Sequence, residues 1–440
     1  MEIAGKRVMV MGLGVSGLAA AHFLARRGAE LLMVDARADL DHSRLPRGEV
    51  HLGFDDPALL KRIELIVVSP GIARDAILLR AADTAHIPVI GEMELASRFL
   101  HAPVIAITGT NGKSTVTTMV GAILRTVEMR VFVGGNLGTP LIEAVDGAYD
   151  AIVVEASSFQ LETIVHFKPH VAVYLNLTDD HLERYRDRDE YGRAKARLFM
   201  NQSATDWAIL NREDAAVWKL APTLRARVIS FGTESIAAGD AIWRDGADLR
   251  FDYGGLRGRI AMDRFALAGQ HNRANAMAAA GAALAMASGP EVIGAALADF
   301  RGLPHRIEFI CEKDGVVYID DSKGTNVGAV MEALEAVAPP VILLAGGIDK
   351  GGDYAPLRPL LAQRARLLVL YGAAREKMRA ALHGASPIAM TTTLAEAVKI
   401  AAENARRGDT VMLSPACASF DQFRDYAERG RIYQELVRAL

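Results

Sequence analysis

The stretch "VIAITGTNGKSTVTTMV", from Val104 to Val120, predicts a phosphate-binding loop between a buried strand and a helix. It departs from the usual G-x-x-x-x-G-K-[ST] pattern because Ile107 stands where the first glycine is expected. That position belongs to the strand side of the turn, so we expect a shorter cradle of backbone N–H groups at a helix N-terminus. Lys113 would reach the β- and γ-phosphates of ATP, and the Ser114 hydroxyl would ligate Mg²⁺. The predicted loop consists of Gly109, Thr110, Asn111, Gly112, Lys113, Ser114 and Thr115.

The composition is that of a folded, nearly neutral protein. Its 440 residues predict about three domains at roughly 150 residues each. A hydrophobic content of 51% allows sizeable cores, and a net charge of −3 gives no reason to expect nucleic acid as a partner. Two cysteines suit a reducing compartment better than a disulfide scaffold. The sequence shows no apolar run of membrane-spanning length, so we expect a cytoplasmic protein with no membrane partner.

Short apolar runs alternate with helical stretches along the chain, which favours an α/β fold with mostly parallel sheets. Strands are expected at 7–11, 31–35, 64–72, 103–108, 150–155, 171–176, 207–210, 316–321, 341–347, 367–371 and 410–415, with short β-structure at 231–268. We expect three domains, each a mostly parallel sheet with flanking helices. They are a Rossmann-like domain at 1–94, a P-loop-type ATPase domain at 95–302 and a second Rossmann-like domain at 303–440.

A second glycine loop lies near the N-terminus. Gly12, Gly14 and Gly17 form a G-x-G-x-x-G pattern after a strand and before a helix, and Asp35 closes the next strand. Such glycines allow a tight turn and a close approach to a pyrophosphate at the helix N-terminus. The motif does not distinguish a dinucleotide from a nucleotide-sugar, and a turn without ligand stays an alternative. A nicotinamide-dependent dehydrogenase is a rival function, but it leaves the Lys113 loop without a role.

Further metal ligands are expected at strand ends near the phosphate loop. Glu155 ends a buried strand and His181 follows another, and parallel strands place functional side chains at their carboxyl ends. A surface charge or helix cap is the alternative for Glu155, and a structural role is the alternative for His181. Lys195 lies on an amphipathic helix, so its pattern alone indicates a solvated lysine.

These residues together resemble the Mur ligase family, the ATP-dependent ligases of peptidoglycan precursor synthesis. The resemblance runs along the whole chain and rests on "GTNGKST", "GGNLG" (134–138), "EASSFQLE" (155–162), "DDHLERY" (179–185), "YGRAKARLF" (191–199), "GQHNRAN" (269–275), "LPHRIE" (303–308), "DDSKGTN" (320–326) and "SPACASFDQF" (414–423). The N-terminal glycine loop and "DSKGTN" resemble the member that adds D-glutamate, and the sequence lacks the D-N-P-R motif that the diamino-acid-adding member usually carries.

The resemblance implies a reaction and a set of roles. A monomer would couple D-glutamate to UDP-N-acetylmuramoyl-L-alanine through an acyl phosphate, using ATP and two Mg²⁺ ions. ATP would be held by the loop 109–115 and by Asn275, Arg306 and Asp321. Metal ligands would be Ser114, Glu155, His181 and Lys195, with Lys113, Glu155, His181 and Lys195 acting in catalysis. The UDP-substrate would contact Gly14, Ser16, Asp35, Arg37, Gly71, Asn136 and His181, and D-glutamate would contact Thr325, Lys350, Ser419 and Phe420.

For Lys195 the resemblance implies a carbamate formed from the neutral amine and CO₂, which reverses the reading as a solvated lysine. One departure from the family pattern is visible, because Gly324 stands where the family commonly has alanine. The stretch "AGGIDKGGDY" keeps Gly346, Gly347 and Lys350 of that pattern. Another amino-acid ligase of the same family, such as a folylpolyglutamate synthetase, and a non-catalytic ATP-binding regulator are the remaining alternatives.

Overall fold

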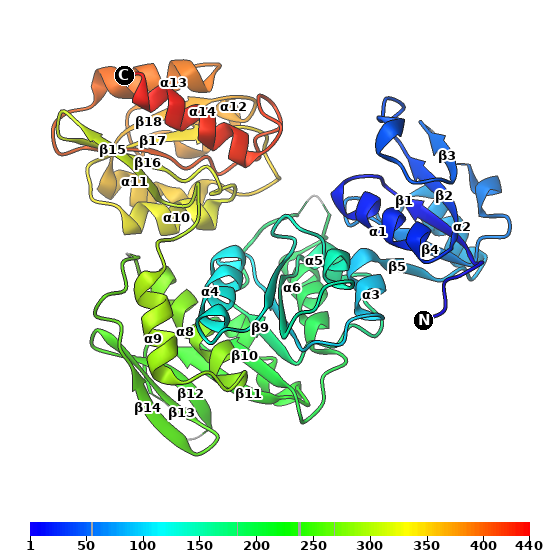
Figure 1. Ribbon diagram of the computed structural model, residues 1–440. Helices are drawn as coiled ribbons and strands as arrows, with labels where there is room; N and C mark the ends of the chain where they lie inside the picture. The colour runs from blue at the N-terminus through cyan, green and yellow to red at the C-terminus, as the bar shows by residue number, and fades with distance from the viewer. Residues whose placement is uncertain (54–55, 183, 236–238, 268) are drawn as a thin grey trace. The chain divides into compact units, whose positions relative to one another are not determined.

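Three β-sheets organise the chain in the computed structural model, which describes residues 1–440 apart from 54–55, 183, 236–238 and 268 (Figure 1). The predicted α/β fold with mostly parallel sheets is confirmed. The chain divides into two compact units: Met1–Asn176, Tyr191–Arg264 and Asn275–Ala298 form the first, and Leu177–Glu190, Phe265–Ala274 and Asp299–Leu440 form the second. The boundaries 1–94, 95–302 and 303–440 stay a prediction. Among the described residues, no helix combines the length and apolar character that crossing a membrane requires.

The first sheet is parallel throughout, with strand order β3-β2-β1-β4-β5. Its elements are β1 Arg7–Met11, α1 Val15–Arg26, β2 Glu30–Asp35, β3 Glu49–Leu52, β4 Leu65–Val68, α2 Ile77–Thr84, β5 Val89–Gly91 and α3 Glu92–Ser97. The turn from β1 into α1 needs glycine, because a Cβ on Gly17 would lie 1.8 Å from the Gly12 carbonyl oxygen. Leu78 of α2 packs over Met9 and Met11 of β1 on one face of the sheet.

The second sheet has the order β14-β13-β12-β11-β10-β9-β6-β8-β7 and is parallel except for β13 and β14. Its elements are β6 Val104–Thr108, α4 Lys113–Thr126, β7 Val131–Gly135, β8 Ala151–Glu155, α5 Ser158–Leu161, β9 Val171–Tyr174, α6 Arg188–Ala196, β10 Trp207–Asn211, α7 Ala215–Trp218, β11 Arg227–Gly232, β12 Asp240–Asp245, β13 Asp248–Tyr253, β14 Leu256–Ile260, α8 Gln270–Ala285 and α9 Pro290–Asp299. β6 lies between β8 and β9, so the loop after Thr108 opens at the carboxyl edge beside the ends of both neighbours.

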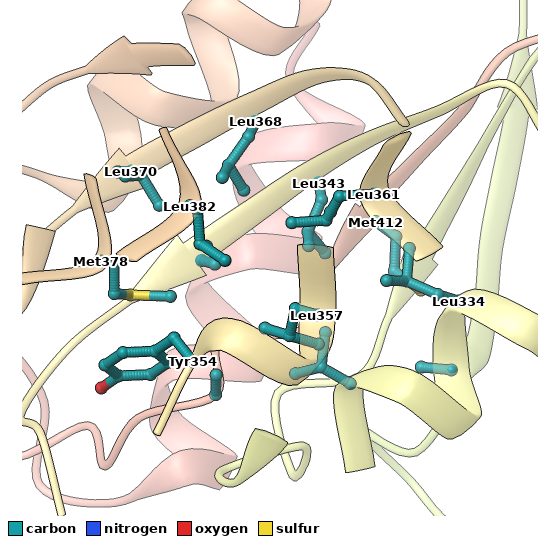
Figure 2. Packing of buried hydrophobic residues seen from close by; sticks show 14 of the residues in the cluster. Leu334, Leu343, Tyr354, Leu357, Leu361, Leu368, Leu370, Met378, Leu382 and Met412 are labelled. Atoms are coloured by element: carbon teal, nitrogen blue, oxygen red, sulfur yellow. The ribbon is translucent and has the colours of Figure 1, made fainter. Parts of the chain in front are cut away.

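The third sheet has the order β15-β16-β20-β17-β18-β19, and only the β15–β16 pair is antiparallel. Its elements are β15 Glu308–Lys313, β16 Val316–Asp320, α10 Val327–Ala336, β17 Val341–Gly346, α11 Arg358–Arg364, β18 Ala365–Tyr371, α12 Arg375–Leu382, β19 Ile388–Met390, α13 Leu394–Asn404, β20 Thr410–Leu413 and α14 Tyr426–Arg438. Alternate residues of β17 face two cores, since Leu343 packs with α10, α11 and α12 whereas Leu344 packs with α13 and α14. Figure 2 shows the first of these cores around Leu343, with Leu361 and Leu382 contributed by the helices.

Candidate active site

The phosphate loop has the backbone that its glycines predict. Gly109 and Gly112 take positive φ values of 152° and 82°, and α4 begins at Lys113 directly after Gly112. A Cβ on Gly112 would lie 2.4 Å from the Asn275 Oδ1, so glycine is also required for space. The Lys113 Nζ donates to the carbonyl oxygens of Gly109 (3.0 Å) and Thr110 (2.7 Å). The ammonium group is thereby held over the loop in which a polyphosphate is expected.

Fewer backbone N–H groups of the loop face outward than the sequence predicted, because the Asn176 side chain binds two of them. The Asn176 Oδ1 accepts from the backbone N–H groups of Thr110 (3.1 Å) and Asn111 (2.8 Å), and its Nδ2 donates to the Asn111 carbonyl (3.2 Å). Two N–H groups that were expected to face an anion therefore face a side-chain amide. Sequence reasoning missed Asn176, although it follows β9 at the same sheet edge and its position was a usable signal.

Glu155, which the sequence predicted as a metal ligand, lies at the carboxyl end of β8 beside the phosphate loop. It ends β8, pairs in register with Ile107 of β6 and is only 3% exposed. Its Oε2 accepts from the Ser114 hydroxyl at 2.5 Å, and its Oε1 accepts from the Asn136 Nδ2 at 2.6 Å. Asn136 reaches it because β7 ends beside β8, with Gly135 opposite Glu155. The cap and surface-charge alternative for Glu155 is wrong, because the carboxylate is buried and Ser157 caps the following helix α5.

Oxygen donors of this kind fit Mg²⁺, which prefers carboxylate and hydroxyl ligands. Ser114 in the first turn of α4 and Glu155 at the strand end offer such donors beside the phosphate loop. The residues present are therefore compatible with a magnesium–nucleotide complex.

Lys195 is buried, not solvated. The residue is 1% exposed, and its Nζ lies 4.3 Å from the centroid of the Tyr191 ring. The Nζ also donates to the Gly109 carbonyl oxygen at 2.8 Å, the same oxygen that accepts from Lys113. The helix pattern alone predicted a solvent-exposed lysine, and that prediction is wrong. The amines of Lys113 and Lys195 both donate to the Gly109 carbonyl oxygen.

The N-terminal glycine loop carries an ion pair at its rim. Asp35 accepts from the Leu13 N–H at 2.6 Å and from the Arg37 Nε at 3.0 Å. Burial alone would raise the pKa of Asp35, but the hydrogen bonds from Arg37 and Leu13 hold that pKa at about 2. Gly14 and Gly71 have open space where a Cβ would be, and Ser16 lies in the first turn of α1. The loop thus leaves room at the helix N-terminus where the sequence predicted a diphosphate.

In the second unit, a cavity of about 270 Å³ contains two of the predicted D-glutamate residues, Thr325 and Lys350. The Lys350 Nζ lies 3.3 Å from the Thr325 Oγ1 and 3.6 Å from the Asp180 Oδ1. The Asn326 Nδ2 donates to the other oxygen of Asp180 at 3.3 Å. Cationic, hydroxyl, amide and carboxylate groups therefore meet in one cavity, which suits a ligand with both an ammonium and a carboxylate. Sequence reasoning missed Asp180 and Asn326.

The other predicted D-glutamate residues lie on the loop after β20. Ser419 is 3% exposed and Phe420 is 69% exposed. Among the described residues that line the cavity, this loop is represented by Ala416, and Ser419 and Phe420 are not included. Their contact with an amino acid stays a prediction.

His181 also lies in the second unit, seven residues beyond the end of β9 and not at the strand end itself. Its φ is 56°, its backbone N–H donates to the Asp180 Oδ1 at 3.0 Å, and its Nε2 is 3.7 Å from the Asp180 Oδ2. The sequence predicted that His181 directly follows a strand end, as Glu155 does, and the structure does not show this. The role of His181 as a metal ligand stays a prediction.

Arg306 and Asp321, which the resemblance assigns to the nucleotide, both lie in the second unit, and this role stays a prediction. Burial raises the pKa of Asp321 to about 7, although the charge of Arg306 and a hydrogen bond from the Ser414 hydroxyl (2.6 Å) oppose that rise. The Arg306 Nη2 lies 3.6 Å from the Glu332 Oε2 and forms an ion pair with it. A carboxyl that is half ionised near neutral pH is unusual in a core and is typical of functional positions.

Three protein-family models together match most of the chain. The Mur ligase MurD-like N-terminal domain matches residues 6–91, the Mur ligase middle domain matches 107–283, and the Mur ligase glutamate ligase domain matches 305–417. The chain belongs to the Mur ligase family. The resemblance carried by the loop at Lys113 is thereby confirmed, and an ATP-dependent, Mg²⁺-requiring enzyme is the general expectation for a Mur ligase.

Curated relatives of this Mur ligase match it from end to end. Proteins named UDP-N-acetylmuramoylalanine–D-glutamate ligase from Geobacter metallireducens and Geotalea daltonii are 45% and 44% identical, over 100% of this chain and 99% of each relative. Among solved structures, a pseudomurein peptide ligase type C from Methanothermus fervidus is 19% identical with a TM-score of 0.63, covering 99% of this chain and 100% of that chain. The MurF ligase from Thermotoga maritima in complex with ADP is 17% identical with a TM-score of 0.62, covering 100% and 97%. At these identities the structures show the shared fold alone.

Proposed function

We propose that the protein is an ATP-dependent amide ligase that adds D-glutamate to UDP-N-acetylmuramoyl-L-alanine and releases ADP and phosphate, in peptidoglycan precursor synthesis. The observation that carries the proposal is the Ser114–Glu155–Asn136 cluster beside the Lys113 loop, in a chain 45% identical over its full length to relatives named for this reaction. An amide does not form from a resting carboxylate, because oxide is a poor leaving group, so ATP is needed to activate it.

The first sheet supplies the site for the UDP end of the substrate. Gly14 precedes α1 and Ser16 lies in its first turn, which suits a diphosphate at the helix N-terminus, and Gly71 would also contact the substrate. Asp35 and Arg37 lie at the rim, where the uracil end would rest. Asn136 and His181 would meet the sugar-peptide end, with Asn136 already oriented by Glu155.

The second sheet supplies the phosphoryl-transfer site. The L-alanyl carboxylate attacks the γ-phosphorus of ATP, ADP leaves, and an acyl phosphate forms; Lys113 offsets the charge on the transferring group. Mg²⁺, when bound, adds positive charge to the phosphates, and two ions would be held by Ser114, Glu155, His181 and the Lys195 carbamate. Gly109 to Thr115 and Asn275 would hold the nucleotide, and the family resemblance assigns its phosphates to Arg306 and its ribose to Asp321.

Burial of Lys195 supports its role as a carbamate. Two ammonium groups on the Gly109 carbonyl repel each other, whereas a carbamate at Lys195 attracts the Lys113 ammonium. The carbamate also adds carboxylate-like oxygens, which are the ligands that Mg²⁺ prefers. The reaction of the amine with CO₂ forms one N–C bond and releases one proton.

The third sheet supplies the amino-acid site. Thr325 and Lys350, which lie 3.3 Å apart, would bind D-glutamate together with Ser419 and Phe420, and its amine would attack the acyl carbon as a neutral group. A tetrahedral intermediate then collapses, the amide forms and phosphate leaves. His181 and solvent are the candidates for the base that takes the proton from the amine.

The two alternative functions, a dehydrogenase and a non-catalytic regulator, do not explain the Ser114–Glu155 cluster or the cavity at Lys350. The test is phosphate release from ATP with Mg²⁺, UDP-N-acetylmuramoyl-L-alanine and D-glutamate, with each component omitted in turn. Release that requires all four supports the proposal. Release with another amino acid in place of D-glutamate would favour a different amino-acid ligase of the family, and tight NADH binding without phosphate release would favour the dehydrogenase. A cytoplasmic location and a monomeric state stay predictions from the sequence.

A further inference from the structure

Arg429 of α14 is the largest fully buried side chain among the described residues. Its Nε donates to the Ser322 hydroxyl at 2.9 Å, its Nη2 to the Ser322 carbonyl at 2.7 Å, and its Nη1 to the Cys417 carbonyl at 3.2 Å. All three acceptors are neutral. Within the described part of the chain, its guanidinium forms no ion pair with a carboxylate. A buried cation without a charged partner is costly, so its retention needs a reason.

The two residues that Arg429 grips lie on different loops. Ser322 follows β16, and Cys417 lies beyond the end of β20; these strands are parallel neighbours whose carboxyl ends lie at one sheet edge. The loops are also joined by the Ala416 N–H, which donates to the Gly324 carbonyl at 2.9 Å. The planar fork of an arginine fixes the angle between its hydrogen bonds, so Arg429 sets the spacing of the two loops.

Both loops reach the cavity that contains Lys350. Thr325, three residues after Ser322, and Ala416, next to Cys417, are among its lining residues. Among the described residues, those that line the cavity do not include Arg429, and its three hydrogen bonds go to Ser322 and Cys417. An effect of Arg429 on the cavity would therefore run through the backbone of these loops.

We propose that Arg429 is a positioning residue for the incoming amino acid. It holds the Ser322 and Cys417 loops at the spacing that binds the amino-acid carboxylates, and its positive charge, which forms no ion pair with a carboxylate among the described residues, favours a dicarboxylic amino acid over a neutral one. This inference rests on the proposed function, since it concerns the D-glutamate site. It predicts that Arg429 affects the amino-acid step and leaves the activation of the L-alanyl carboxylate intact.

The experiment compares Arg429→Lys, Arg429→Gln and Ser322→Ala with wild type, and uses Arg431→Lys as the matched control, an exposed arginine on the same helix. Losing charged hydrogen bonds of this kind raises the KM for D-glutamate about tenfold in Arg429→Lys and less in Ser322→Ala. The KM values for ATP and for the UDP-substrate stay within about twofold in all variants. Arg429→Gln in addition lowers the preference for D-glutamate over D-glutamine, which Arg429→Lys retains.

A D-glutamate KM that stays at the wild-type value in folded variants overturns the inference. So does an equal rise of all three KM values, which is what a merely structural role would produce. If the Arg429 variants do not fold, the milder Ser322→Ala decides by the same readout. Borohydride trapping of the acyl phosphate, with no D-glutamate present, separates the two proposals. Failure of that step in wild type counts against the proposed function, whereas success with unchanged D-glutamate KM in the variants counts against Arg429 alone.

Discussion

Asp321→Asn is expected to stabilise the protein at alkaline pH and not at acidic pH. Asp321 is 2% exposed, and its carboxyl accepts from the Ser414 hydroxyl and from the Ile307 N–H at 3.3 Å. Asparagine has the same shape and can retain both contacts, because its amide oxygen accepts from Ile307 and its NH₂ donates to the Ser414 oxygen. The substitution therefore removes the charge at little other cost.

The magnitude follows from the pKa of Asp321. Burial raises it from 3.8 to about 7, and each pKa unit corresponds to about 1.4 kcal/mol, so ionising the folded protein costs up to about 4 kcal/mol. The folded state binds this proton more tightly than the unfolded chain does. Wild-type stability from this group is thus highest below pH 4, falls as pH rises towards 7, and is constant above. The asparagine variant has no carboxyl to ionise, so its free energy of unfolding does not fall in this way. Its excess stability over wild type therefore grows as the pH rises from 4 to 7.

Differential scanning calorimetry at pH 5 and pH 8 measures the effect. At about 3 °C per kcal/mol, the variant should melt roughly 10 °C above wild type at pH 8, with a smaller gap at pH 5. Hydrogen exchange of β16 and β20 assigns the transition to the second unit. Glu335→Gln, an exposed carboxylate on α10, is the control and should show no such trend. A melting difference for Asp321→Asn that is the same at both pH values would refute the reasoning.

Further substitutions test the N-terminal turn and the site. Gly17→Ala should cost about 3 kcal/mol by overpacking, because its Cβ would meet the Gly12 carbonyl, whereas Gly14→Ala has open space and should melt like wild type; equal melting of both would contradict this. Asn176→Ala removes the side-chain amide that fixes the loop at Thr110 and Asn111, so the ordered loop conformation is lost and the KM for ATP should rise about tenfold, with the UDP-substrate KM unchanged. A lower ATP KM would mean instead that the amide competes with the phosphates for these N–H groups, and an unaltered one counts against any role of Asn176. Glu155→Gln should lower kcat about 100-fold or more, with a folded protein by circular dichroism; wild-type turnover would remove Glu155 from the mechanism.

The fold was largely predictable because its central strands are continuous apolar runs. β6, β8 and β17 are buried along their whole length, and such runs bounded by turn residues indicate parallel strands. The strands that were missed are shorter, more polar or at a sheet edge, namely β3, β5, β7, β11, β15 and β19. β3 and β19 are only half buried, so the sequence there lacks the pattern that burial imposes.

The site was predictable where chemistry is local in sequence and not where it depends on packing. The Lys113 loop is one continuous motif, and Glu155 was found because it ends a buried strand. Asn176 was missed because a polar residue after a strand is common, and only the fold brings its amide to the loop. Lys195 sits on a helix whose pattern does not reveal that this residue points inward. Arg429 carries no signal in sequence, since exposed and buried arginines look alike there.

The measurement that tests the central claim most directly follows the oxygen atoms. UDP-N-acetylmuramoyl-L-alanine labelled with ¹⁸O in its carboxylate is turned over with ATP, Mg²⁺ and D-glutamate, and the released phosphate is analysed by mass spectrometry. An acyl phosphate requires the carboxylate oxygen that attacks phosphorus to leave with it, so each phosphate should carry a labelled oxygen. Phosphate without label, formed alongside the amide product, would contradict activation of the carboxylate at the Lys113 loop.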